Sequence, residues 1–147
     1  MATFSRHATA IWVGDVARGE GKVTAGSDAF TAAISFPRLA GEPVGTTTPE
    51  ELLAASHANC YAIALRSVMA QHRGRARRVS VTATVTADKG GGVIRLVSSR
   101  LEATVEGLEG IDPTQLAEVA RIAKDACTIS TAIKGAANII LNVTAIP

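Results

Sequence analysis

The segment from Thr48 to Gln71 or His72 constrains the fold most, because it has the pattern of a helix that is apolar on nearly every face. Thr48 suits the N-cap, Pro49 the first helical position and Glu51 the third, which together match a capping box. The interior of the segment is rich in apolar side chains: Leu52, Leu53, Ala54, Ala55, Ala58, Tyr61, Ala62, Ile63, Ala64, Leu65, Val68 and Met69. A surface helix shows one apolar stripe, so we expect this helix to be buried on most sides, at the centre of the fold.

Segments typical of β-strands precede and follow this helix. Before it, turn residues separate three short strands, predicted at 8–13, 21–24 and 30–36. After it, a hairpin is predicted from strands at 79–87 and 93–105. A helix that starts at 112–113 and a short helix at 128–134 follow, and a last strand is predicted at 138–145. This order predicts an α+β fold with antiparallel sheets packed on one long, buried central helix.

The composition indicates one folded domain spanning residues 1–147. Hydrophobic residues make up 47% and charged residues 19%, which excludes a disordered chain. Aromatic residues are only 3% and the net charge is +2, so we expect no nucleic-acid partner. The four arginines in 73–78 follow the predicted helix end, and we interpret them as a solvated face rather than a nucleic-acid site.

Cysteine usage and the apolar pattern predict a cytoplasmic protein with no membrane partner. Two cysteines are too few for a disulfide-stapled secreted scaffold. The first seven residues lack the pattern of a signal peptide, and the longest apolar stretch, around 61–65, is far too short to span a bilayer. In a reducing compartment, we expect both cysteines to be free thiols.

The two cysteines occupy different predicted environments. Cys60 lies in the middle of the central helix, where a thiol is either a small apolar core residue or a reactive group. Cys127 lies just before the helix predicted from Thr128, whose positive N-terminal end stabilises a thiolate. No Cys-x-x-Cys spacing is present, which excludes a thioredoxin-type motif.

His57 precedes Cys60 by three positions on the same helix face and leaves three interpretations open. It could join Cys60 and Cys127 in a zinc site, although a structural zinc site usually has four ligands. It could act as a base for a nearby thiol. We favour the third interpretation, an exposed helix residue.

Glu50 has a structural role in the first turn of the central helix, where a carboxylate complements the helix dipole. It precedes Cys60 by about 15 Å along a straight helix, which is too far for direct contact. Any role of Glu50 at Cys60 therefore requires another chain or a break near the helix start.

Two segments of the sequence resemble the OsmC/Ohr family of hydroperoxide reductases. They read Thr47-Thr-Pro-Glu-Glu-Leu-Leu-Ala-Ala-Ser-His-Ala-Asn-Cys60 and Ala126-Cys127-Thr-Ile-Ser-Thr-Ala-Ile-Lys-Gly135. The patterns Trp12-x-Gly14 and Gly19-x-Gly21 resemble the OsmC branch more than the Ohr branch. The chain departs from the family at Thr128, where Pro is frequent, and at Thr48, where Asn is usual.

The resemblance implies a cysteine-based peroxidase that needs no metal or haem cofactor. By analogy, Cys60 attacks the peroxide and Cys127 resolves the resulting sulfenic acid. The position of Cys127 at a helix start by itself favours Cys127 as the thiolate. We follow the resemblance. It also implies an arginine and a glutamate beside the reactive thiol, matched here by Arg38 and Glu50, with Arg18 as the alternative arginine. Apolar candidates for the substrate surround are Leu39, Tyr61, Ile129 and Ile133.

The same resemblance implies the partners. The family forms an intertwined homodimer with sites at the subunit interface, which agrees with a helix that is apolar all round. The implied substrate is an organic hydroperoxide and the implied reductant a dithiol, such as that of a lipoyl-bearing protein, with glutathione as the second choice. Two other classes of function remain: a non-catalytic dimer that binds a small molecule or lipid, and a zinc-bound regulatory or structural protein.

Overall fold

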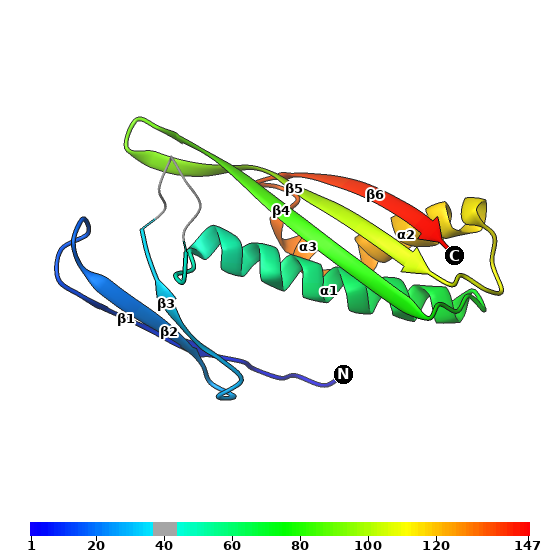
Figure 1. The fold of residues 1–147 in the computed structure, drawn as a ribbon, viewed down its shortest axis with the longest axis horizontal. Coiled ribbons are helices and arrows are strands. Elements are labelled where there is room, and N and C mark those ends of the chain that lie inside the picture. Colours follow the sequence, from blue (N-terminus) through cyan, green and yellow to red (C-terminus); the bar gives the residue numbers. More distant parts are fainter. Residues whose placement is uncertain (37–43) are drawn as a thin grey trace. The chain divides into compact units, whose positions relative to one another are not determined.

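The order of elements along the chain is the predicted one, three strands, a long helix, a hairpin, two helices and a strand. The computed structural model describes residues 1–36 and 44–147 and divides into two units, 1–52 and 53–147 (Figure 1). Each unit is described separately below. Helix α1 (Pro49–Gln71) begins in the first unit and continues into the second.

The first unit contains an antiparallel sheet of β1 (Ala8–Val13), β2 (Glu20–Ala25) and β3 (Thr31–Ile34), in that order. Its glycine pattern has a packing reason: a Cβ added at Gly21 would lie 2.7 Å from Cε3 of Trp12, which is opposite it in the register. The indole covers this position, so only glycine fits. The Trp12–Gly21 pattern is thus a local packing feature of the β1–β2 pair.

The start of α1 follows the predicted capping residues. The backbone N–H of Glu51 donates to Oγ1 of Thr48 at 3.3 Å, and that of Leu52 donates to the Thr48 carbonyl at 3.0 Å. The Glu51 carboxylate accepts a hydrogen bond of 2.7 Å from the Thr47 hydroxyl. Thr47 also hydrogen-bonds through its backbone to residues 33 and 35, which ties the helix start to strand β3.

The second sheet consists of β4 (Arg78–Gly90), β5 (Val93–Glu106) and β6 (Asn138–Ile146). The predicted hairpin is confirmed, with β4 and β5 antiparallel and a turn at Gly91 and Gly92. The prediction of antiparallel sheets is wrong for β6, which pairs with β5 in parallel. The reason is the crossover through α2 (Pro113–Ala126) and α3 (Thr128–Ile133), which returns the chain to the first half of β5, where Asn138 pairs with Ser98.

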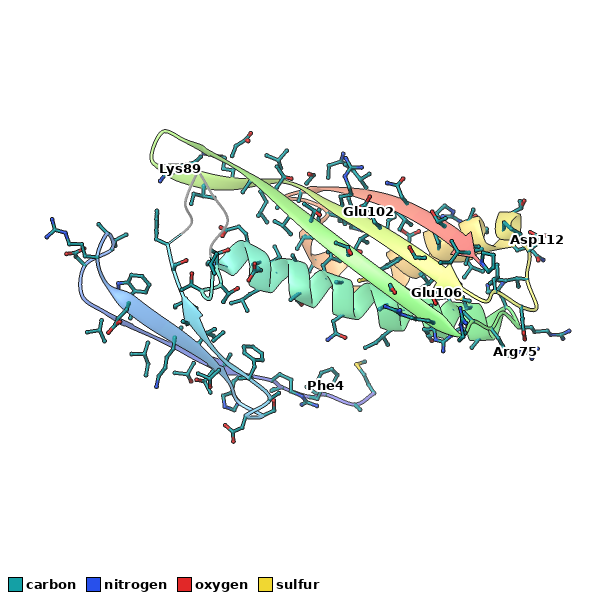
Figure 2. The ribbon with its side chains drawn as sticks, in the orientation of Figure 1. Phe4, Arg75, Lys89, Glu102, Glu106 and Asp112 are labelled. Carbon is teal, nitrogen blue, oxygen red and sulfur yellow. The ribbon has the colours of Figure 1, made fainter. Side chains whose placement is uncertain are left out.

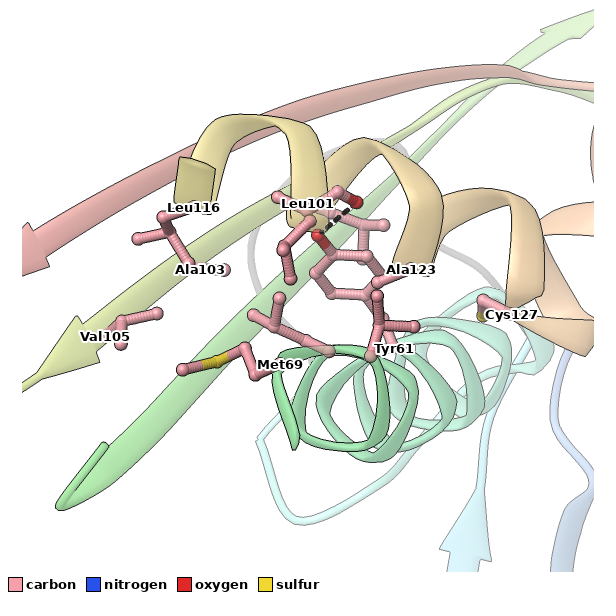
Figure 3. Packing of buried hydrophobic residues seen from close by; sticks show 12 residues of the cluster. Tyr61, Met69, Leu101, Ala103, Val105, Leu116, Ala123 and Cys127 are labelled. Carbon is pink, nitrogen blue, oxygen red and sulfur yellow. Dashed lines mark hydrogen bonds between the residues drawn. The ribbon is translucent and has the colours of Figure 1, made fainter. Parts of the chain in front are cut away.

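The core of the second unit lies where α1 and α2 meet the face of β5 (Figure 3). Alternate residues of β5 point into it, as the period of a strand requires. Tyr61 is completely buried, and its hydroxyl donates to the carbonyl of Ala120 at 3.0 Å. The fully or nearly fully buried members are Tyr61, Leu65, Val68, Met69, Leu101, Ala103, Val105, Leu116, Val119, Ala120, Ala123 and Cys127.

Helix α1 differs from the prediction in how much of it is buried. Its buried residues form one stripe: His57, Tyr61, Leu65, Val68 and Met69. Ile63, on another face, is 65% exposed in this single chain. Cys60 and Ala64 beside the stripe are half-buried against the core, so α1 is covered on one side by the described chain and exposed at Ile63, although the sequence predicted burial on most sides.

The arginine-rich segment after α1 lies on the surface, as predicted. Arg75 pairs with Glu109 at 3.4 Å, and Arg77 and Arg78 pair with Glu106 at 3.3 and 3.6 Å (Figure 2). Exposed pairs of this kind contribute at most about 1 kcal/mol each. Among the described residues, none of the helices has the length and apolar character needed to cross a membrane.

Candidate active site

Cys127 occupies the junction between α2 and α3, where it ends the first helix and caps the second. Its backbone is extended, with φ −74° and ψ 115°, and its Sγ accepts a hydrogen bond of 3.5 Å from the backbone N–H of Ser130. The side chain is completely buried. The position predicted from sequence, a thiol just before a helix, is confirmed.

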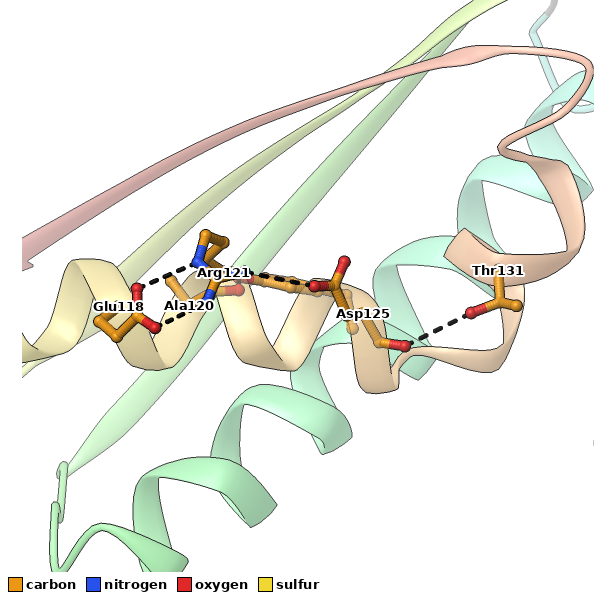
Figure 4. A network of polar contacts seen from close by, with 6 residues as sticks. Glu118, Ala120, Arg121, Asp125 and Thr131 are labelled. Atoms are coloured by element: carbon orange, nitrogen blue, oxygen red, sulfur yellow. Dashed lines mark hydrogen bonds and ion pairs between the residues drawn. The ribbon is translucent and has the colours of Figure 1, made fainter.

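A network of exposed polar contacts lies along α2 and at its junction with α3 (Figure 4). The hydroxyl of Thr131 donates to the carbonyl of Asp125 at 3.4 Å, which links the first residues of α3 to the end of α2. Arg121 donates to both carboxylate oxygens of Glu118, at 2.7 and 3.0 Å. This pairing lowers the pKa of Glu118 and raises that of Arg121.

Cys60 lies next to Cys127. The Cys127 side chain and the backbone N–H groups of Ile129 and Thr128 lie close enough to the Cys60 thiol to shift its pKa. Backbone N–H groups of the N-terminal turn of α3 therefore lie at both sulfur atoms. The N–H of Ser130 donates to Cys127, and the two preceding N–H groups act on Cys60. The sequence predicted such N–H groups for Cys127 alone, and the structure has them at Cys60 as well.

The ionisation of Cys60 is opposed by its surroundings in the described residues. Burial raises the pKa of the Cys60 thiol, and the side chain of Cys127 raises it further. The N–H groups of Ile129 and Thr128 lower this pKa but do not compensate. A reactive thiolate at Cys60 therefore needs a further positive group.

His57 is completely buried, so the favoured interpretation of an exposed helix residue is wrong. Its Nδ1 lies 2.7 Å from Oγ of Ser99 on β5, and its Nε2 lies 2.7 Å from Oγ of Ser130 on α3. Burial lowers the pKa of the imidazole, which favours the neutral ring. Because both nitrogens are engaged by hydroxyls, neither is free to bind zinc with the two cysteines. Within 1–36 and 44–147, no group of three or more His, Cys, Asp or Glu side chains is arranged to hold a metal ion.

The remaining predicted site residues lie in the first unit or outside the described residues. Glu50 is half-buried in the first turn of α1, and its Oε2 is buried with no hydrogen-bond partner among the described residues. Arg18 lies exposed between β1 and β2, where its backbone N–H donates to the Asp15 carboxylate at 2.8 Å. Arg38 and Leu39 fall outside the described residues.

The residues predicted to surround the substrate have different environments. Tyr61 is a core residue rather than a pocket residue, and burial raises the pKa of its phenol strongly. Ile129 and Ile133 on α3 are half-buried. Sequence reasoning missed Ser99 and Ser130; the second lies inside the Cys127 motif, but nothing near Ser99 in the sequence pointed to it.

The comparisons with known proteins agree with this fold. The chain is 28% identical to peroxiredoxin OsmC of Escherichia coli strain K12 over 132 residues, 90% of this chain and 92% of that protein. It is similar to the structure of the organic hydroperoxide resistance protein OsmC of Legionella pneumophila, with 25% identity, a TM-score of 0.78 and coverage of 98% and 99%. The organic hydroperoxide resistance protein OhrB of Bacillus subtilis has the same fold, at 22% identity, a TM-score of 0.69 and coverage of 97% and 100%.

The family model described as OsmC-like protein matches residues 41–142, which include both cysteines, His57 and its two serines. The match covers more than half of the chain and spans all of α1 and the second sheet except the last residues of β6. This chain therefore belongs to the OsmC-like protein family.

Proposed function

We propose that this protein is a thiol-dependent peroxidase that reduces organic hydroperoxides to alcohols, with Cys60 as the attacking thiol and Cys127 as the resolving thiol. The observation that carries the proposal is the meeting of the two side chains at the N-terminal turn of α3. Relatives named peroxiredoxin OsmC and organic hydroperoxide resistance protein support this class of reaction.

In the first step, the Cys60 thiolate attacks the outer oxygen of the peroxide. The O–O bond breaks, a sulfenic acid forms on Cys60, and the leaving alkoxide takes a proton to become the alcohol. The N–H groups of Thr128 and Ile129 stabilise negative charge on the sulfur before the attack. The sulfur is oxidised and the peroxide is reduced by two electrons.

In the second step, the Cys127 thiol attacks the sulfenic sulfur. A disulfide forms between Cys60 and Cys127, and the hydroxyl leaves as water with the proton of the Cys127 thiol. An external dithiol then reduces the disulfide by exchange and restores both thiols. A lipoyl dithiol is the proposed reductant.

A cation is needed to ionise Cys60, because burial raises its pKa. Arg38, held by a bidentate pair with Glu50, is the proposed group. The buried Glu50 Oε2, which has no hydrogen-bond partner in the described residues, supports a role for this carboxylate. Arg18 is the alternative.

Comparing Arg38→Ala with Arg18→Ala is expected to identify the cation. Loss of the arginine beside the thiol raises the pKa of Cys60, and each unit of increase lowers the thiolate fraction at neutral pH about tenfold. The measurement is the rate of iodoacetamide alkylation of Cys60 against pH, in a Cys127→Ser background. A shift in Arg18→Ala alone would assign the role to Arg18, and no shift in either variant would contradict an arginine-activated thiol.

The proposal includes a homodimer. Ile63 on α1 is 65% exposed in the single chain, and strand β1 presents exposed apolar side chains at Ile11 and Val13. When a second copy of the chain covers these side chains, apolar surface is removed from water, and this favours association. The family resemblance of both cysteine motifs supports the same assembly.

The test of the proposed function is the consumption of an organic hydroperoxide by the reduced protein with excess dithiol. We expect wild type to turn over with one alcohol formed per peroxide, and Cys60→Ser to fall to the uncatalysed rate. Serine is the matched control because it keeps the size of the side chain and removes the nucleophilic sulfur. A folded, reduced wild type that consumes no hydroperoxide would overturn the proposal.

That negative result would favour the alternative, a non-catalytic dimer that binds a small molecule. A pocket of about 310 Å³ beside α3, lined in part by Lys124, Ser130 and Lys134, could hold such a ligand. In that case, both cysteines would label with thiol reagents at ordinary or slower rates, whereas an activated thiolate labels much faster.

A further inference from the structure

We propose that His57 is a positioning residue for the disulfide-forming step: through Ser130 it fixes the start of α3, so that the Cys127 sulfur faces Cys60. This inference rests on the proposed function and deepens it. In this proposal, His57 touches neither the peroxide nor the reacting oxygen. It acts through a buried polar network that lies beside the two cysteines.

The network consists of three side chains from three separate elements. His57 on α1, Ser99 on β5 and Ser130 on α3 are 0%, 1% and 3% exposed, and both hydrogen bonds of the imidazole are 2.7 Å long. Buried polar groups are costly unless they are paired, and this ring has a partner at each nitrogen. The two bonds therefore lock the imidazole between the sheet and α3.

The link from this network to the sulfur atoms runs through the backbone of α3. Ser130 holds the His57 ring with its hydroxyl, and its own N–H donates to Cys127 Sγ at 3.5 Å. The preceding N–H groups of Thr128 and Ile129 meet Cys60. A displacement of Ser130 thus moves the donors to both sulfur atoms.

Helix α3 needs such an anchor because it has only six residues. A helix this short has no stability of its own in water, and its position depends on its tertiary contacts. Ser130 is the buried residue of α3, and its hydroxyl bonds the His57 ring. The contact with His57 is therefore a buried side-chain tie between α3 and the central helix that carries Cys60.

The geometry favours positioning over proton transfer. A neutral imidazole has one donor and one acceptor nitrogen, and the two hydroxyls satisfy both. The condensation of the Cys60 sulfenic acid with the Cys127 thiol yields a disulfide and water without an added base. What this step requires is alignment of the two sulfur atoms, and a misplacement of about 1 Å can cost about a hundredfold in rate.

The substitutions His57→Asn and His57→Gln form a matched pair. The amide of Asn reaches the place of Nδ1 and can bond Ser99, whereas the longer Gln reaches the place of Nε2 and can bond Ser130. Both variants replace the ring by a neutral amide of similar polarity. The two variants differ by one methylene and in the partner they retain, and loss of the aromatic ring affects both.

The experiment is a single turnover of the reduced protein with one equivalent of an organic hydroperoxide, followed as two phases. Dimedone trapping measures the sulfenic acid on Cys60, and loss of both thiols measures the disulfide. In His57→Asn we expect the second phase to slow by about 10- to 100-fold and the first to change by less than about threefold. In His57→Gln the second phase is expected within about threefold of wild type.

Ser130→Ala is the second variant, since it removes the hydroxyl and leaves the ring and the backbone N–H to Cys127 in place. It is expected to slow the second phase by the same factor of about 10 to 100. This variant keeps the test available if His57→Asn does not fold. Equal slowing of both phases, equal slowing in Asn and Gln, or an unchanged second phase in Ser130→Ala would each overturn the inference.

Failure of the proposed function is distinguishable from failure of this inference. If wild type does not react with hydroperoxide, the rate of Cys60–Cys127 disulfide formation is measured with diamide, which oxidises thiol pairs without a peroxide step. We expect wild type and His57→Gln to form the disulfide faster with diamide than His57→Asn and Ser130→Ala do. Identical diamide rates in all four proteins would refute the positioning role.

Discussion

A Cys127→Ser variant is expected to react with one equivalent of organic hydroperoxide per chain and then stop. Without a resolving thiol, Cys60 remains as the sulfenic acid, which dimedone traps. With dithiol present, turnover is expected to fall by on the order of a hundredfold, because the reductant must attack a half-buried sulfur without a pre-positioned partner. The measurement is peroxide consumed per chain, with the modified cysteine identified by mass spectrometry.

The control is Cys60→Ser, which keeps Cys127 and is expected to consume no peroxide and bind no dimedone. Dimedone on Cys127 in this variant would reverse the roles of the two thiols. Turnover of Cys127→Ser at the wild-type rate would mean that the dithiol, rather than Cys127, resolves the sulfenic acid.

Replacing Leu65 by alanine is expected to lower the free energy of unfolding by about 2–5 kcal/mol. Leu65 is completely buried on α1 among the residues of β5 and α2, so the substitution removes apolar contacts and leaves a cavity. The measurement is urea unfolding at fixed protein concentration, because the proposed dimer would make the apparent stability concentration-dependent.

Ser67→Ala is the matched control, since Ser67 is exposed on the same helix two residues later. Its free energy of unfolding is expected to stay within about 0.5 kcal/mol of wild type. Similar losses in the two variants would contradict the placement of Leu65 in the core.

The sequence predicted the elements well because their signals are local. The Thr48 cap, the turn predicted at 88–92 and the alternation in 79–87 each depend on neighbouring residues, and all three features are present, with the turn shortened to Gly91 and Gly92 since β4 continues to Gly90. The direction of β6 was predicted wrongly because a strand's own pattern does not say whether the chain returns by a hairpin or a crossover.

The site was predicted in part. Cys127 was identified from the helix that follows it, and the pairing with Cys60 came from the family resemblance. His57 was misinterpreted because its partners lie 42 and 73 residues away, on elements whose packing no local pattern reveals. Its burial and neutrality are properties of the tertiary structure. The cytoplasmic location and the reductant stay predictions.

The parallel pairing of β5 with β6 also has a consequence for folding kinetics. The hairpin of β4 and β5 joins residues that are close in sequence, whereas β6 can pair only after the chain has passed through α2 and α3. Non-local pairing of this kind closes a long loop and forms slowly. Cys60 and Cys127 are also far apart in the sequence, on either side of this hairpin, so we expect their meeting to follow its closure. An oxidant present during refolding would therefore encounter separated thiols first.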